Sequence, residues 1–139
     1  MPIVDVGELM SNRFALPLLI VTALAFPRAD AHHSFAAEFS YDESGTITGE
    51  VVEVLFVNPH ARYFIALEDE SGNTVLWDAQ TRSPNALFAI GWNKDTIRVG
   101  ERITIEGNLG RDKTRKIWIR EVRKASGETV RPTGEEPPA

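Results

Sequence analysis

The stretch GTITGEVVEVLFVN, residues 45–58, predicts a β-strand over residues 45–57. The period in this stretch is close to two, which is typical of a strand, and its apolar positions among polar residues are Ile47, Val51, Val54 and Phe56. Gly49 interrupts the alternation, as a bulge or the bend of a barrel would. The strand is long enough to serve both halves of a small barrel, so we expect an all-β fold.

Two further strands follow with the same alternation. They cover residues 61–69 and 73–80, and the composition of residues 70–73 indicates a hairpin turn between them. Pro59 ends the first strand because it has no N–H to donate to a ladder.

The chain then changes character before strands resume. Residues 83–91 predict one short helix, since Ser83 suits its N-cap and Gly91 its C′ position. A fourth strand follows the turn at residues 99–101, and residues 117–125 predict a fifth strand. This order indicates a small five-stranded OB-like barrel with one short helix between strands three and four. A small open sandwich is the alternative.

We divide the chain into four parts on these grounds. They are a signal peptide (1–31), a segment with a histidine pair (32–44), an OB-like barrel (45–124) and a largely disordered C-terminal tail (125–139).

The first part reads as an export signal. Residues 14–26 form an apolar run, which is too short for a membrane helix but suits the apolar region of a signal peptide. Arg13 precedes the run, and Ala29-Asp30-Ala31 predicts cleavage after Ala31. Cleavage after residues 23–25 is a weaker alternative. Met10 is a better start than Met1, so residues 1–9 are expected to be dispensable. We expect a periplasmic or secreted protein, with no stable membrane insertion after cleavage.

Composition excludes several kinds of site. The chain has no cysteine, so neither a disulfide nor a thiolate ligand is available. Its net charge is −5, and phosphate binding needs clustered Lys and Arg, so nucleic acid is not expected as a partner. The sequence contains no classical catalytic motif, so we expect no enzyme.

The three histidines of the chain fall in two short motifs, AHHSF (31–35) and NPH (58–60). Cleavage after Ala31 would make His32 the N-terminal residue, whose α-amine and Nδ1 can chelate one metal ion. Both kinds of group titrate near neutral pH, and such nitrogen ligands suit Cu(II). His60 is the expected second arm of this histidine brace, and His33 is a competing ligand.

Other interpretations of these residues remain open. The histidine pair could be a solvated N-terminus, and His60 could form a hydrogen bond within its loop or serve a polar site without metal. Glu38 and Asp78 could supply oxygen ligands, although their spacing does not single them out.

Aromatic residues suggest how the histidine segment is held. Phe35 and Phe39 are expected to anchor it to the barrel by burying apolar area. Trp77 and Trp118 are expected in the core, while Trp92 either plugs the barrel or contacts a partner. The basic loop at residues 111–116 indicates a solvated turn or an anion site.

The chain also resembles a known family. The residues AHHSFAAEF, then G-x-I-x-G-x-V-x-x-V, NPH and SPNALFAIGW-x-x-D-x-I-x-x-G-x-x-I-x-I-x-G, resemble domain-of-unknown-function family 6152, a group of small exported bacterial proteins. The resemblance covers nearly all of residues 31–124. Its matching positions are His32, His33, Ser34, Phe35, Asn58, Pro59, His60, Ser83, Pro84, Asn85, Gly91 and Trp92. It implies export and a single-domain layout, but no activity. Ala61 stands where the family usually carries a bulky aromatic residue.

Two functions follow from these observations. The first is an exported metal-binding barrel, with copper as the expected ion and His32, His33 and His60 as candidate ligands, acting in binding, delivery or sensing. The second is a periplasmic interaction module that recognises a protein or small ligand without metal, through a face around Asn58, Arg62 and Trp92.

Overall fold

The computed structural model describes residues 31–133, with side chains from residue 35 onward. The expected signal peptide lies outside this range except for Ala31, and residues 1–9, which were expected to be dispensable, lie wholly outside it. Two short helices, six strands and one 3₁₀ turn make up the described chain. They are α1 (Ala31–Glu38), β1 (Phe39–Leu55), β2 (Arg62–Glu68), β3 (Thr74–Gln80), α2 (Pro84–Phe88), β4 (Arg102–Gly110), η1 (Arg111–Lys113), β5 (Lys116–Lys124) and β6 (Thr129–Val130).

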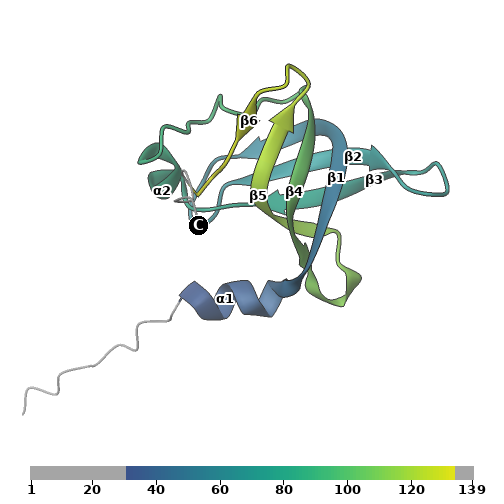
Figure 1. Cartoon of the computed structure of the whole chain (residues 1–139), viewed down its shortest axis with the longest axis horizontal. Helices are drawn as coiled ribbons and strands as arrows, with labels where there is room; N and C mark the ends of the chain where they lie inside the picture. Colours follow the sequence, from purple (N-terminus) through teal and green to yellow (C-terminus); the bar gives the residue numbers. More distant parts are fainter. Residues whose placement is uncertain (1–30, 134–139) are drawn as a thin grey trace, which may run out of the picture.

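The strands form one sheet that closes into a barrel (Figure 1). Its order is β3-β2-β1-β4-β5-β6, and the neighbours in this order pair antiparallel. The barrel closes because residues 78–80 of β3 pair in parallel with residues 116–118 of β5. The expectation of a mostly β, OB-like fold is confirmed, whereas the expected number of strands is not.

The long strand β1 belongs to both halves of the barrel, as expected from its length. Residues 44–50 pair with β4, whereas residues 50–55 pair with β2. A register shift lies between Val51 and Glu53, just after Gly49. A Cβ at Gly49 would overlap the backbone of Ala66, so glycine there permits close approach of the neighbouring strand.

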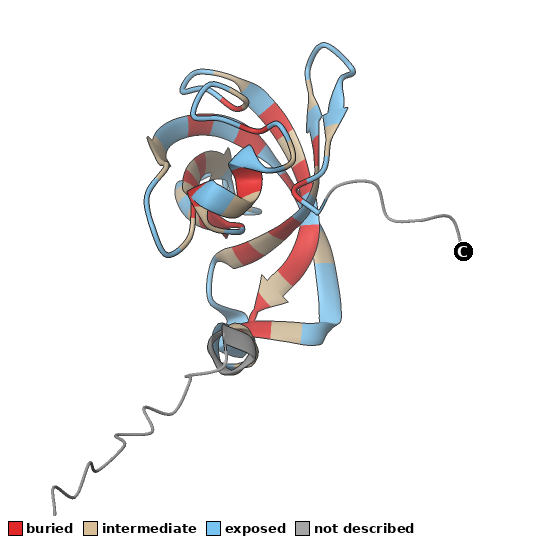
Figure 2. Cartoon of the chain, turned by 90° about the vertical axis from the view of Figure 1, so that its left-hand side faces the viewer, coloured by how far each residue is buried: buried red, intermediate tan, exposed pale blue. Residues whose placement is uncertain are grey.

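Alternating side chains of the strands fill the interior, and the strands in Figure 2 carry alternating buried and exposed bands. The predicted apolar positions Ile47 and Val51 of β1 are buried. So are the predicted positions of the last two long strands, namely Ile103, Ile105, Ile117, Ile119 and Val122. The period-two pattern therefore identified the core-facing side of these strands.

Three expectations about element number and length need correction. The sheet has six strands, because β6 pairs with Val122 and Arg123 inside the segment that was expected to be a tail. β1 starts at Phe39, six residues earlier than expected, and a second helix, α1, precedes it. Residue propensities and hydrophobic periodicity did not predict these three features, because each is stabilised by contacts with distant residues and not by a pattern in its own sequence.

The helix expected over residues 83–91 is shorter, although its start was correctly placed. Ser83 accepts a hydrogen bond from the Ala86 N–H at 3.4 Å, and Pro84 occupies the first turn. The helix ends at Phe88, with Ala89 as a C-cap that keeps helical φ and ψ, and the chain turns at Gly91, whose φ is +87°. None of the described helices has the length and apolar character needed to span a membrane.

Candidate functional site

A groove with a volume of about 620 Å³ lies between α1, the turn before β2, the start of α2 and β5. We call it the α1 groove. Its wall is formed by Phe35, Glu38, Phe39, Tyr41, Pro59, His60, Arg82, Ser83, Ala86 and Trp118. Figure 1 shows why these distant segments meet, because α1 lies across one end of the barrel before the chain enters β1.

Aromatic rings form one side of the α1 groove, with Trp118 at their centre. The Trp118 ring lies 5.4 Å from Phe35, 5.6 Å from Phe39 and 5.1 Å from His60, measured between ring centroids. Phe35 also contacts Phe39 at 5.4 Å and Tyr41 at 4.8 Å. Phe39 is 2% exposed. These two phenylalanines therefore anchor the N-terminal segment to the barrel, as predicted.

Polar contacts hold α1 in the same place. The Arg111 Nε donates to the Ala36 carbonyl oxygen at 2.6 Å, and the Lys116 ammonium lies 2.6 Å from the Glu38 carboxylate. Both cations come from the basic segment 111–116, which we expected to be a solvated turn or an anion site. Two of its cations instead bind α1, a role that the local sequence does not signal because Ala36 and Arg111 are 75 residues apart.

The turn that carries His60 is fixed to the start of the α2 region. The Ala61 N–H donates to the Arg82 carbonyl oxygen at 3.0 Å, and the Thr81 N–H donates to the Ala61 carbonyl oxygen at 3.0 Å. Ala61 itself is fully buried. These two hydrogen bonds place Arg82 beside His60, so the groove is bordered by one imidazole and one guanidinium.

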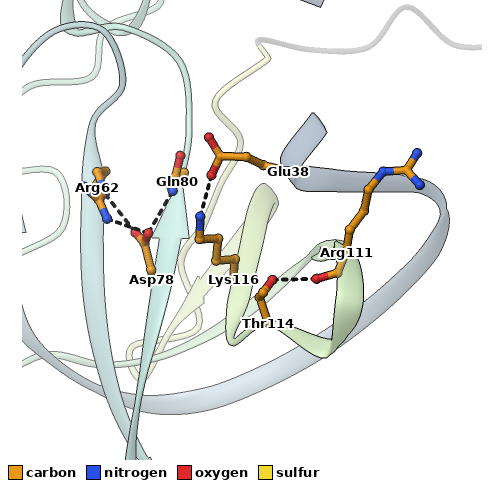
Figure 3. Close-up of polar contacts among 7 residues, drawn as sticks. All are labelled: Glu38, Arg62, Asp78, Gln80, Arg111, Thr114 and Lys116. Atoms are coloured by element: carbon orange, nitrogen blue, oxygen red, sulfur yellow. Dashed lines mark hydrogen bonds and ion pairs between the residues drawn. The ribbon is translucent and has the colours of Figure 1, made fainter. Parts of the chain in front are cut away.

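A second, polar hollow of about 400 Å³ adjoins the groove and shares Glu38, Pro59 and His60 with it. Arg62 donates to both carboxylate oxygens of Asp78, at 3.0 and 2.6 Å, and the Gln80 amide donates to Asp78 at 2.8 Å (Figure 3). The hydrogen bonding of the Arg62 guanidinium to the Asp78 carboxylate raises the pKa of Arg62. Asp78 is therefore engaged on both oxygens, which leaves it poorly suited as a metal ligand.

The structure brings together only some of the predicted site residues. Asn58, His60 and Arg62 border the same polar hollow. Trp92 does not join them, because it is 5% exposed and lines another hollow with Lys124 and Val130. Its alternative role, as a plug of the barrel, fits this burial.

His32 and His33 lie in the backbone of α1, and their side chains are outside the described residues. Position 32 precedes Phe35 by three residues within α1. Among the side chains from residue 35 to residue 133, no three histidine, aspartate or glutamate groups gather as metal ligands would.

Two groove residues were missed or misplaced by sequence reasoning. Trp118 was expected in the core, yet it is half-buried and faces the groove. Arg82 was not singled out at all. Its position directly before the Ser83-Pro84 helix start was the only available signal.

Comparison with known families now gives one identification. A family model described as "Family of unknown function (DUF6152)" matches residues 20–118, which is most of the chain. The chain belongs to this family. The groove residues Phe35, His60 and Trp118 all fall inside the matched DUF6152 region. No curated protein matches the sequence.

Several solved structures are similar to this DUF6152 protein. The mitochondrial single-stranded DNA-binding protein Rim1 of S. cerevisiae has 15% identity and a TM-score of 0.44, with 60% of this chain and 94% of that chain covered. The N-terminal domain of PriB from Thermoanaerobacter tencongensis has 22% identity and a TM-score of 0.43, with 59% and 94% covered. A small single-stranded DNA-binding protein from Streptomyces coelicolor has 11% identity and a TM-score of 0.33, with 70% and 100% covered.

These neighbours correct one expectation. On charge alone, nucleic acid was not expected as a partner, yet two of the three structures named above are described as single-stranded DNA-binding proteins. Net charge does not exclude such a partner, because binding depends on how charges are placed on a surface and not on their sum. The likeness by itself assigns no ligand to this chain.

Proposed function

We propose that this DUF6152 protein is exported, is cleaved after Ala31, and binds copper between His32 and His60. The α-amine and Nδ1 of His32 supply two nitrogen ligands, and the imidazole of His60 supplies the third. His33 is the competing imidazole. The protein acts in binding, delivery or sensing of the ion rather than in turnover.

The observation that supports this proposal is that α1 and His60 border the same groove. Phe35 and His60 both contact the Trp118 ring, at 5.4 and 5.1 Å. Position 32 precedes Phe35 by three residues of α1, which is about 4.5 Å along the helix axis.

The chemistry of the ligand set favours Cu(II) over other first-row ions. Three nitrogen ligands in a near-planar arrangement suit the tetragonal geometry of Cu(II), which also binds nitrogen most tightly in this series. Binding requires a free α-amine, so it depends on cleavage at one particular peptide bond.

The test compares two forms of the protein that differ by one residue. One form begins at His32, and the other carries an additional Met before His32. Each is titrated with Cu(II) and examined by electron paramagnetic resonance. We expect tight binding by the first form and a large loss of affinity in the second, because the added residue removes the amine from the chelate.

Two single substitutions complete this test. His60→Ala is expected to change the copper spectrum of the form that begins at His32, whereas Asn58→Ala, in the same turn, is expected to leave it unchanged. Equal and weak binding by both forms would contradict the proposal. An unchanged spectrum in His60→Ala would remove His60 from the ligand set.

A second candidate function is an interaction module that binds a protein or small ligand without metal. It is favoured by the apolar, aromatic wall of the α1 groove and by Tyr41, which is 58% exposed beside Phe35. Binding of a partner by protein that has been freed of metal would support this candidate over the first.

A further inference from the structure

The α1 groove has the size and lining of a small-molecule site. Its volume of about 620 Å³ lies within the usual range for ligand sites in proteins, roughly 300–1,000 Å³. One side consists of aromatic rings centred on Trp118, and the only carboxylate in the lining belongs to Glu38. Because Lys116 lies 2.6 Å from that carboxylate, the negative charge is compensated within the wall.

Arg82 differs from the other cations around the groove. Arg62 is bound by Asp78, Lys116 by Glu38, and Arg111 by the Ala36 carbonyl oxygen. The guanidinium of Arg82 is exposed and has no ion-pair partner among residues 35–133. The groove is thus lined by one uncompensated positive charge beside an aromatic wall.

The position of Arg82 is set by the backbone on both of its sides. Its carbonyl oxygen accepts the hydrogen bond from Ala61, and the next residue, Ser83, caps α2. The backbone of Arg82 is therefore fixed at the groove, so binding of a ligand by the side chain need not order the backbone as well.

From this arrangement, we propose that the α1 groove binds a small aromatic carboxylate. The aromatic body lies against Trp118 and Phe35, and the carboxylate is bound by Arg82. A guanidinium binds a carboxylate through two parallel N–H···O hydrogen bonds, which a neutral amide cannot reproduce. Aromatic rings contact the tilted rings of this wall by edge-to-face packing. The proposal does not depend on copper.

The experiment uses the full chain with EDTA present. In the full chain the amine of residue 32 is part of a peptide bond, so this test is separate from that of the metal site. Naphthalene-2-carboxylate and naphthalene-2-carboxamide are titrated by isothermal calorimetry into three proteins, namely the native chain, Arg82→Gln and Arg98→Gln. Arg98 is an exposed arginine that lines none of the hollows described above, and its substitution changes the net charge equally.

We expect the native chain and Arg98→Gln to bind the carboxylate equally, and Arg82→Gln to bind it about tenfold more weakly, which corresponds to about 1.4 kcal/mol. The amide should bind all three proteins with the same low affinity. In two-dimensional NMR spectra the carboxylate should shift the Trp118 indole signal and leave that of Trp92 in place.

Three results would overturn the proposal. The first is equal affinity of the native chain for the carboxylate and the amide. The second is an equal effect of Arg82→Gln and Arg98→Gln. The third is a shift confined to the Trp92 indole, which would place the ligand in the hollow near β6. Circular dichroism of each variant shows whether a lost affinity arises from loss of the fold.

Discussion

The docking of α1 against the barrel can be tested through the contact between Phe35 and Trp118. Their ring centroids are 5.4 Å apart and the ring planes are 87° apart, which is an edge-to-face pair. Such pairs contribute about 0.5–1.5 kcal/mol beyond the area that they bury. Both rings are half-buried, so we expect a coupling free energy in the lower part of this range.

A double-mutant cycle with Phe35→Leu and Trp118→Leu isolates this coupling. Trp118→Leu also loses the contacts with Phe39 and His60, so it removes three aromatic pairs and should lower the free energy of unfolding by about 1.5–4.5 kcal/mol. Phe35→Leu should have a smaller effect. Urea unfolding of the native chain, both single variants and the double variant supplies the four free energies.

The matched control is the pair formed by Phe56 and Phe88, whose centroids are 5.5 Å apart at an interplanar angle of 71°. This pair has similar geometry but does not involve α1, so its cycle should give a coupling of similar size. A coupling near zero for Phe35 and Trp118, together with a clear coupling for Phe56 and Phe88, would refute the docking of α1. It would also remove the main support for a shared site with His60.

Two further predictions concern the interior of the barrel. Burial raises the pKa of Tyr63 to about 12 from an ordinary value of 10.0, so between these values the unfolded chain loses a proton that the folded chain keeps. The free energy of unfolding should therefore fall as pH rises from 10 to 12, by up to about 2.7 kcal/mol. In Tyr63→Phe this loss should be absent and stability at neutral pH unchanged or higher, because the buried hydroxyl has no hydrogen-bond partner among the residues that the structure describes. A native chain whose urea midpoint is constant over this pH range would contradict the assignment. Separately, Gly107→Ala should destabilise the chain by about 3 kcal/mol in urea unfolding, because a methyl group would overlap the carbonyl group of Trp118. Gly72→Ala is the control, because nothing lies near a Cβ at that position and the substitution introduces only the strain of a φ of +80°. If both substitutions lowered the free energy of unfolding equally, the close approach of β4 and β5 at Gly107 would be contradicted.

Much of the fold could be predicted from local patterns. The alternation in residues 45–57 correctly predicted a strand with Ile47 and Val51 facing the core. The helix start at Ser83 could also be predicted, since capping depends on residues adjacent in sequence. β6 could not be predicted, because two residues carry no periodic pattern and are ordered by pairing with β5.

The candidate site was predictable only in part. Its conspicuous residues, His60 and the anchoring Phe35, stand in short motifs that the sequence displays. Arg82 and Trp118 do not, because nothing beside them in the sequence indicates that barrel closure places them at one groove. The role of Trp92 was left open for the same reason, since composition does not tell a buried plug from an exposed contact.

By itself, the sequence determined the mostly β character of the chain, the inward face of its main strands and its membership of the DUF6152 family. These depend on spacing and identity of residues that are neighbours in the chain. Only the tertiary structure decided that α1, the His60 turn, Arg82 and Trp118 border one groove. The physical reason is that the groove is created by the parallel pairing of β3 with β5 and by contacts such as that of Lys116 with Glu38, 78 positions apart, which no local pattern encodes.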